Sequence, residues 1–347
     1  MLYFHNDYSE GCHENILKRM LETNLEQTPG YGTDAYCEAA AMKIRELCQD
    51  NSLDIHFMVG GTQTNMTVIA AALRAHQGVV CAQTGHIQVH ETGAVESTGH
   101  KVLALPTADG KITAKQVATV INEHRTNEAM EHMVQPKMVY ISSPSELGTI
   151  YSLRELTDLS QVCRENGLYL FLDGARLGYG LAASDSDVTL ADLARLCDVF
   201  YIGGTKQGAL FGEAVVISSP AIAEDFRYMI KQRGGMLAKG RLLGIQFEAL
   251  LQDDLYFRLA RKANAMADQI RGVLDELGYP LYTPGSTNQI FAILPDTLLD
   301  RLGNEFTFSQ ECRVDETHRA VRFCTSWATE QKNVDALCQA LVRLTAT

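Results

Sequence analysis

The chain has 347 residues, of which 46% are hydrophobic and 21% are charged, so it is long enough to bury a large core and a smaller second unit. Its formal net charge is −12 and it has no block of like charges, which excludes the basic patch that binding to nucleic acid or to a membrane surface needs. The N-terminus lacks the features of a signal peptide, and no stretch reaches the roughly 20 apolar residues of a membrane span. We therefore expect a cytoplasmic enzyme that acts on a small molecule.

The nine cysteines form an odd set that is scattered from Cys12 to Cys338 and contains no C-x-x-C motif. Such a set predicts neither a disulfide framework nor a zinc site. We expect most of these cysteines to be reduced thiols in the core.

Short apolar runs alternate with amphipathic stretches as far as about residue 220. The runs that we interpret as buried strands are "IHFMV", "GVVCA", "KVLAL", "KMVYIS", "LYLFL" and "VFYIG". This rhythm predicts an α/β fold with a mostly parallel sheet that helices cover on both faces. From about residue 240 the pattern changes to one long helical stretch, short strands and a final helix near "NVDALCQALVRL". We therefore predict a large domain of residues 1–240 and a small α+β domain of residues 241–347.

The stretch "MVGGTQTNMTVIAAAL" predicts a strand, a glycine turn and a helix. Backbone N–H groups at the start of that helix, together with the Thr62 hydroxyl, are able to hold a phosphate. The stretch lacks both G-x-G-x-x-G and G-x-x-x-x-G-K-[ST], so neither a dinucleotide site nor an ATP site is indicated. An ordinary strand-to-helix turn is the alternative.

The stretch "QTGHIQVHETGA" contains His86, His90 and Glu91. Two histidines four residues apart on a helix can bind zinc, but there is no third ligand nearby and no H-E-x-x-H motif, so we expect no metal. The flat ring of His86 is able to stack on an aromatic ligand. His90 is interpreted as a solvated helix residue.

Asp173 ends the apolar strand in "LYLFLDGARLGYG". A carboxylate at the end of a buried strand needs a cationic partner, or its pKa shifts. The partner is either Arg176, three residues further on, or the protonated nitrogen of a heterocyclic ligand.

Lys206 follows the last strand of the alternating region, in "YIGGTKQGALFGE". The glycines place it at the carboxyl edge of the sheet, where α/β proteins bind their ligands. The alternative is a solvated lysine in a surface turn.

These motifs occur in the order that a pyridoxal phosphate enzyme requires. The chain resembles the threonine aldolases, including the low-specificity L-threonine and phenylserine aldolase types, which have the aspartate-aminotransferase-like fold (fold type I). The segments that carry the resemblance are "FHNDYSEG", "PGYGTDAY", "GGTQTN", "HIQVHETGA", "SELGTIYSLREL", "LDGARL", "GGTKQGALFGEAVV" and "VRFCTSWATE". They span nearly the whole chain, and their order is more specific than any single one of them.

The resemblance implies pyridoxal 5′-phosphate as the cofactor. It assigns Lys206 to the covalent bond with the cofactor aldehyde, Asp173 to the pyridine nitrogen and His86 to stacking on the ring. The residues that it places on the phosphate are Gly61, Thr62, Gln63 and Thr205.

The resemblance also implies a substrate-binding set. Arg322 and Arg176 match residues near the substrate carboxylate, and Arg176 also counts among the cofactor contacts. The N-terminal residues that line the site in the family are Asn6, Asp7 and Ser9, although "HND" stands here where many members have a serine before the aspartate.

A subunit interface forms part of the active site in this family. The resemblance therefore implies a homodimer or homotetramer in which Tyr31 and basic residues of the segment "KQRGGMLAKGR" reach a neighbour's site. These basic residues are Lys231, Arg233 and Lys239.

One departure concerns the base that accepts the β-hydroxyl proton. Many threonine aldolases have a histidine in a "THN" segment, and here "PSELG" puts Glu146 at that place. The implied reaction is cleavage of L-threonine, L-allo-threonine or a related β-hydroxy-α-amino acid to glycine and an aldehyde. The alternatives are another enzyme of the same fold, such as a β-eliminating lyase or an aminotransferase, and a cofactor-binding protein without turnover.

Overall fold

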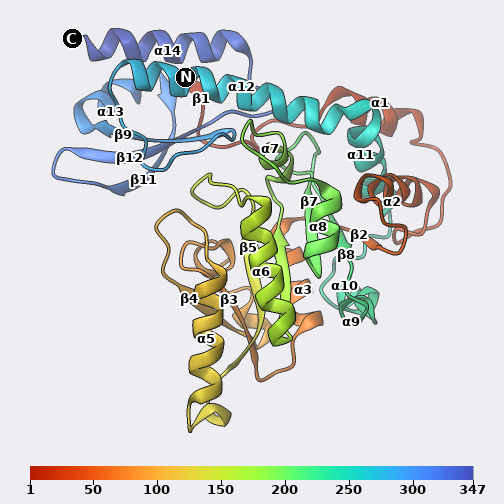
Figure 1. Ribbon diagram of the computed structural model, residues 1–347. Coiled ribbons are helices and arrows are strands. Elements are labelled where there is room, and N and C mark those ends of the chain that lie inside the picture. The colour runs from red at the N-terminus through yellow and green to blue at the C-terminus, as the bar shows by residue number, and fades with distance from the viewer. Residues whose placement is uncertain (347) are drawn as a thin grey trace.

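The computed structural model describes residues 1–346, and its larger part is built around a seven-stranded sheet (Figure 1). The strands of this sheet are β2 (Asp54–Met58), β3 (Gln77–Ala82), β4 (Lys101–Leu105), β5 (Gln135–Ser142), β6 (Tyr169–Asp173), β7 (Val199–Gly203) and β8 (Glu213–Ile217). Their order across the sheet is β2-β8-β7-β6-β5-β3-β4, and β8 alone runs in the direction opposite to the other six strands. The prediction of a mostly parallel sheet is confirmed.

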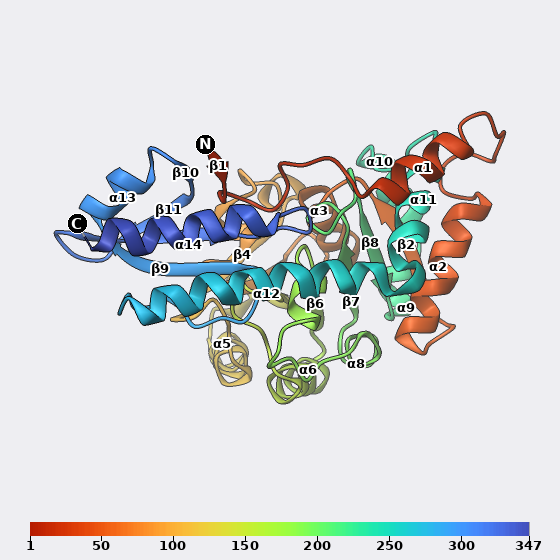
Figure 2. The same ribbon diagram turned by 90° about the horizontal axis from the view of Figure 1, so that it is seen from above.

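Helices cover both faces of this sheet, which explains why its strands are almost continuously apolar (Figure 2). One face is covered by α5 (Ala114–Thr126), α6 (Leu153–Asn166) and α8 (Leu190–Leu196). The other face is covered by α3 (Gly61–Ala72), α4 (His86–Val89), α9 (Pro220–Ala223) and α10 (Phe226–Gln232). At the β2 end of the sheet, α1 (Glu14–Glu22), α2 (Ala35–Cys48) and α11 (Arg241–Leu251) pack on one another.

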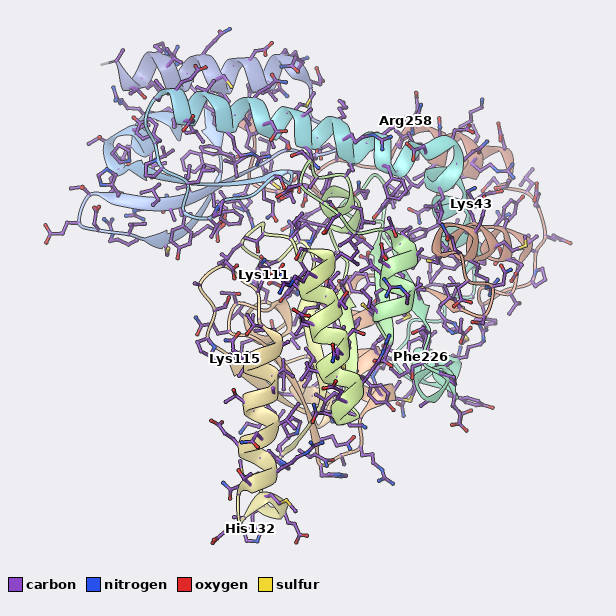
Figure 3. The ribbon with its side chains drawn as sticks, viewed as in Figure 1. Lys43, Lys111, Lys115, His132, Phe226 and Arg258 are labelled. Atoms are coloured by element: carbon purple, nitrogen blue, oxygen red, sulfur yellow. The ribbon has the colours of Figure 1, made fainter. Side chains whose placement is uncertain are left out.

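Local sequence signals set the ends of the covering helices. Ser152 and Glu155 form a reciprocal capping box at the start of α6, and Gly167 ends this helix in the left-handed conformation. Lys111, labelled in Figure 3, donates a 2.7 Å hydrogen bond to Glu155 and so ties the segment before α5 to the first turn of α6.

The smaller part combines strands and helices, as predicted, and its three-stranded sheet is antiparallel. Its strands are β9 (Gln289–Pro295), β11 (Ser309–Arg313) and β12 (His318–Cys324), with β12 in the centre. Its helices are α12 (Leu255–Glu276), α13 (Asp296–Leu302) and α14 (Gln331–Thr345). The N-terminal strand β1 (Leu2–Tyr3) pairs with β10 (Phe306–Thr307), so the start of the chain belongs to this part.

Helix α12 contributes side chains to the hydrophobic cores of both parts, and it runs along both parts in Figures 1 and 2. Tyr256 and Leu259 of this helix are buried in the core of the large sheet, whereas Met266 and Ile270 are buried with the small sheet. The division at residue 240 into two folding domains remains a prediction. Within residues 1–346, no helix is both long and apolar enough to cross a membrane.

The contact between α2 and α11 has no room for an added methyl group. A Cβ built on Gly244 lies 2.4 Å from the backbone nitrogen of Cys37, whereas a Cβ on Gly272 of α12 meets nothing within 4 Å. We expect Gly244→Ala to lower the free energy of unfolding by about 1–3 kcal/mol, the usual cost of overpacking. Denaturation followed by circular dichroism measures this change.

Gly272→Ala is the matched control, because it makes the same substitution within a helix but in open space. It should raise the free energy of unfolding by up to about 1 kcal/mol, since alanine favours the helix over glycine. Equal effects of the two substitutions would contradict the close approach of α2 and α11.

Candidate active site

The carboxyl ends of the parallel strands open into a cavity of about 580 Å³ between the two parts of the chain. Polar residues that follow five different strands line it, as expected for the ligand-binding edge of an α/β sheet. The residues predicted from sequence that line the cavity are Gly61, Thr62, His86, Glu146, Asp173, Arg176, Thr205, Lys206 and Arg322. The other lining residues include Tyr8, Gly60, His90, Tyr201, Glu213 and Glu311.

Lys206 follows β7 and is held in a close-fitting turn. Its backbone oxygen accepts a 2.7 Å hydrogen bond from the Tyr179 hydroxyl, and its Nζ lies 5.9 Å from the centre of the Tyr8 ring. Burial, helped by the positive charge of Arg176, lowers the pKa of the lysine amine. A lysine amine with a lowered pKa is a better nucleophile at neutral pH, because more of it is uncharged.

Asp173, at the end of β6, is ionised in a buried place. Burial alone would raise its pKa, but the charge of His86 and hydrogen bonds from Tyr140 and other neighbours lower the pKa below its usual value. The Tyr140 hydroxyl lies 2.5 Å from its Oδ2, and the backbone N–H of Ala175 donates to its Oδ1 at 3.0 Å. This carboxylate is therefore available as a negative charge at the floor of the cavity.

Asn65 of α3 links Asp173 to His86. Its Nδ2 donates to Asp173 Oδ2 at 3.0 Å and to Glu91 Oε1 at 2.8 Å, and the same Glu91 oxygen lies 2.8 Å from His86 Nδ1. Burial opposes the charge on His86, but the Glu91 bond and the charge of Asp173 raise its pKa. Neither Glu91 nor Asn65 was assigned a role from the sequence, and the position of Asn65 inside a helix gave no signal.

The predicted phosphate turn forms the start of α3. The helix begins at Gly61, and its cap residue Gly60 supplies no side-chain hydrogen bond to the first turn. A Cβ on Gly61 would lie 3.1 Å from the Tyr201 hydroxyl, so glycine keeps this end of the cavity open. Gln63 is directed elsewhere, because its Nε2 donates to the Arg233 backbone oxygen at 3.0 Å.

The two arginines predicted near the substrate carboxylate differ in how tightly other residues of the chain bind them. Arg176 forms a bidentate ion pair with the fully buried Asp7, with N···O distances of 2.7 and 2.9 Å. Arg322 on β12 has looser contacts, 3.5 Å from Nε to Glu311 Oε1 and 3.4 Å from Nη2 to the His5 backbone oxygen. Arg322 is therefore the more available of the two for an incoming carboxylate.

The N-terminal residues assigned to the substrate lie beside the cavity, where Tyr8 forms the wall. Asn6 Oδ1 accepts hydrogen bonds from the Tyr8 backbone and from the Ser9 hydroxyl, and so shapes this segment. Tyr31 lies outside the cavity, with Lys231 Nζ 4.7 Å from the centre of its ring. A role for Tyr31 in a neighbouring subunit remains a prediction.

Glu146 follows β5 and approaches the cavity beside His86. Its Oε1 accepts hydrogen bonds from the Ser142 hydroxyl at 2.7 Å and from the His86 backbone N–H at 2.8 Å. Burial is the main reason why its pKa is raised, and the nearby Asp173 adds to the effect. A carboxyl group whose pKa is raised towards neutral pH is suited to proton transfer.

The cavity fits a flat, phosphate-bearing heterocycle. It combines an uncapped helix start, a buried carboxylate, a lysine amine shifted towards neutrality and a histidine ring. Asn65 Oδ1 and Glu91 Oε2 are buried without a hydrogen-bond partner, so two oxygens beside the cavity can still accept hydrogen bonds. In the part of the chain that the structure describes, no group of three or more His, Cys, Asp or Glu side chains could hold a metal ion.

Comparison with known sequences gives an independent view of the chain. Residues 7–297 match the beta-eliminating lyase family. The low specificity L-threonine aldolase of Pseudomonas aeruginosa is 30% identical over 341 residues, which cover 96% of this chain and 95% of that protein. That of Saccharomyces cerevisiae is 24% identical over 303 residues, covering 85% of this chain and 76% of that protein.

Solved structures agree with this result. The structure of Leishmania major threonine aldolase matches with a TM-score of 0.97 at 46% identity, covering 99% of this chain and 100% of that one. A mutant aspartate aminotransferase of Thermus thermophilus matches with a TM-score of 0.73 at 16% identity, covering 99% of this chain and 91% of that one. The second match concerns the fold alone, and it confirms the predicted aspartate-aminotransferase-like fold.

The ion pair between His86 and Glu91 leads to a prediction about the free protein. Glu91→Gln removes the carboxylate whose hydrogen bond and charge raise the pKa of His86, while the burial that lowers this pKa and the charge of Asp173 that raises it both remain. We expect the pKa of His86 to be lower than in the wild-type protein, as measured by an NMR titration of the ring. Glu123→Gln, on the exposed face of α5, is the control and should leave His86 unchanged. An unaltered titration in Glu91→Gln would contradict the pairing.

Proposed function

The chain belongs to the beta-eliminating lyase family, and from this premise and its threonine aldolase relatives we propose that it cleaves threonine-type β-hydroxy-α-amino acids to glycine and an aldehyde. It is a lyase that depends on pyridoxal 5′-phosphate. The observation that carries the proposal is that Lys206, Asp173, Arg322 and Glu146 line one cavity. Together they provide an amine, a buried anion, a cation for a carboxylate and a group that accepts a proton.

Four features of the cavity are proposed to hold the cofactor. The Lys206 amine bonds to its aldehyde carbon, Asp173 pairs with its pyridine nitrogen, and His86 packs on its ring. The start of α3 at Gly61 and Thr62 receives its phosphate. When bound, the cofactor supplies a ring that accepts the electron pair of the bond being broken.

The substrate is proposed to be oriented by Arg322. A guanidinium fork fixes the α-carboxylate with two hydrogen bonds, which selects the Cα–Cβ bond for cleavage by holding it at the right angle. Arg322 is suited to this role because its present contacts to Glu311 and His5 are long and easily exchanged. Arg176 is proposed to act near the same carboxylate through its positive charge, since Asp7 already occupies its fork.

Glu146 is proposed as the base that takes the proton of the β-hydroxyl group, directly or through water. Its Oε1 is oriented by Ser142 and by the His86 backbone, which fixes the carboxyl group at the cavity wall. Because burial raises its pKa, the ionised form is a stronger base than an exposed glutamate. Loss of the β-hydroxyl proton then accompanies release of the aldehyde.

β-Elimination and transamination remain the alternative reactions, because the family includes β-eliminating lyases and both reactions use a similar lysine and aspartate. Both begin by breaking the Cα–H bond, whereas aldol cleavage breaks Cα–Cβ and needs a β-hydroxyl group. The products therefore separate them.

The location and the oligomeric state of the enzyme are also proposed. We propose a cytoplasmic homodimer or homotetramer, in which Tyr31 and its neighbour Lys231 reach the cavity of another subunit. The support is that both residues lie outside the cavity of their own chain, and that 46% of the Tyr31 surface is exposed.

Product analysis tests the proposed function. With threonine or allo-threonine, the holoenzyme should form glycine and acetaldehyde in equal amounts, while 2-aminobutyrate, which lacks the β-hydroxyl group, should bind without turnover. Lys206→Ala should lose the covalent cofactor and nearly all activity while remaining folded. Stoichiometric keto acid or ammonia with little glycine would overturn the aldolase assignment in favour of the alternatives.

Arg322 and Glu146 should affect different kinetic constants. Arg322→Lys removes a bidentate hold and should mainly raise KM, lowering kcat/KM by about 10- to 100-fold, since a hydrogen bond to a charged group contributes about 1.5–3 kcal/mol. Glu146→Gln should mainly lower kcat, by about 10²- to 10⁴-fold, as for loss of a general base. Steady-state assays of acetaldehyde release measure both constants.

Arg319→Lys is the matched control for the arginine change. It lies on the same strand as Arg322, three residues away and so on the opposite face, where it pairs with Asp296. It should leave both constants nearly unchanged. A Glu146→Gln enzyme with undiminished kcat would show that the base is another group.

A further inference from the structure

Glu213 is a buried carboxyl group in the cavity wall to which the reaction above gives no role. It is the first residue of β8 and lies between Gly203 of β7 and Met58 of β2. Only 3% of its surface is exposed, and it lines the cavity together with Thr205 and the start of α3.

The hydrogen bonds of Glu213 depend on whether it carries a proton. Its Oε2 accepts from the Gly204 backbone N–H at 3.0 Å, and its Oε1 lies 2.9 Å from the Thr205 hydroxyl oxygen. That hydroxyl oxygen also accepts from the Gly212 backbone N–H at 3.0 Å. A hydroxyl group has one donor and two acceptor positions. The Gly212 N–H occupies one acceptor position, and Glu213 takes either the donor position or the second acceptor position.

The direction of the bond between Glu213 and Thr205 decides what Thr205 offers to the cavity. When Glu213 is ionised, it can only accept, and the single proton of Thr205 is used on it. When Glu213 is protonated, Oε1–H can donate to Thr205, whose own proton is then free to point into the cavity. The Thr205 hydroxyl becomes a donor to a ligand only in the second case.

The surroundings of Glu213 favour the protonated form near neutral pH. Burial raises its pKa to about 8, the charge of Asp173 acts in the same direction, and Lys206 opposes them. The other titratable groups facing it are the hydroxyls of Tyr201 and Tyr256, which burial keeps neutral by raising their pKa values. An anion at the start of α3 adds a further negative charge to this neighbourhood and favours the protonated form more strongly.

We propose that Glu213 is a positioning residue that, while protonated, turns the Thr205 hydroxyl towards the cofactor phosphate and loosens the hold on that phosphate when it ionises. Binding of the phosphate is then coupled to retention or uptake of one proton. The proposal rests on the proposed function only in placing the phosphate at the start of α3, and it requires no turnover.

A pair of probes isolates the phosphate from the chemistry of Lys206. Deoxypyridoxine 5′-phosphate and deoxypyridoxine lack the aldehyde and differ only in the phosphate, so neither bonds covalently to the lysine. Calorimetry on the cofactor-free protein gives, at each pH, the affinity for deoxypyridoxine 5′-phosphate divided by the affinity for deoxypyridoxine. We expect this ratio to fall above the pKa of Glu213 by up to about tenfold per pH unit, the limit for one linked proton.

Proton exchange gives a second readout on the same samples. At a pH where Glu213 is mostly ionised in the free protein, binding of the phosphate probe should take up close to one proton, as measured from its heat in buffers of different ionisation enthalpy. The phosphate-free probe should take up far less.

Three variants identify the group responsible. The amide of Glu213→Gln can donate to Thr205 and accept from Gly204 at every pH, so its affinity ratio should stay near the low-pH value of the wild type. Thr205→Val lacks the donor and should lower the ratio at low pH by about tenfold, the effect of one hydrogen bond to a charged group. Glu311→Gln, which changes another carboxyl group of the same cavity, should retain the wild-type pH dependence.

The wild-type protein alone can overturn the proposal, so the result does not depend on the folding of a variant. A ratio that is constant across pH, or a Glu213→Gln protein that keeps the wild-type slope, would overturn it. A protein that prefers neither probe at any pH would show that the phosphate lies elsewhere and would also overturn it. Glycine release from threonine would test the aldolase function separately in that case.

Discussion

An ionised carboxylate at the end of an apolar strand needs compensation, and the compensation of Asp173 organises this site. Burying such a charge is costly, and here the cost is offset by the Tyr140 hydroxyl, the Asn65 amide, the Ala175 N–H and the charge of His86. Each of these groups comes from a different part of the sheet or its helices. The negative charge is therefore in place before a cationic ring nitrogen arrives, which is the preorganisation that electrostatic catalysis requires.

A second buried ion pair joins the two parts of the chain beside the cavity. Asp7 follows the N-terminal strand of the small part, Arg176 follows β6 of the large part, and Asn288 precedes β9 and donates to Asp7 at 2.9 Å. Removing one member of a buried pair leaves an unpaired charge, so this contact is costly to break. It fixes the N-terminal segment that carries Tyr8 to the cavity wall.

The sequence was sufficient to predict residues that follow strands, because parallel strands bring their carboxyl ends to one edge. Lys206, Asp173, His86 and Glu146 were identified in this way or through the family resemblance, and all line the cavity. It left open whether Arg176 neutralises Asp173, and the structure pairs Arg176 with Asp7, 169 residues away. Asn65, Tyr140 and Glu213 were missed because their roles arise from tertiary contacts that apolar periodicity does not report.

The shared helix α12 has a mechanical consequence. Its 22 residues span about 33 Å as one continuous rod, and its two halves are embedded in different cores. A hinge rotation of one core against the other would have to bend this rod, so the fold resists opening and closing by domain rotation. Admission and release of small molecules then fall to segments that the rod does not stiffen. Strand β11 is such a segment, because it is an exposed outer strand that carries Glu311 to the cavity beside Arg322.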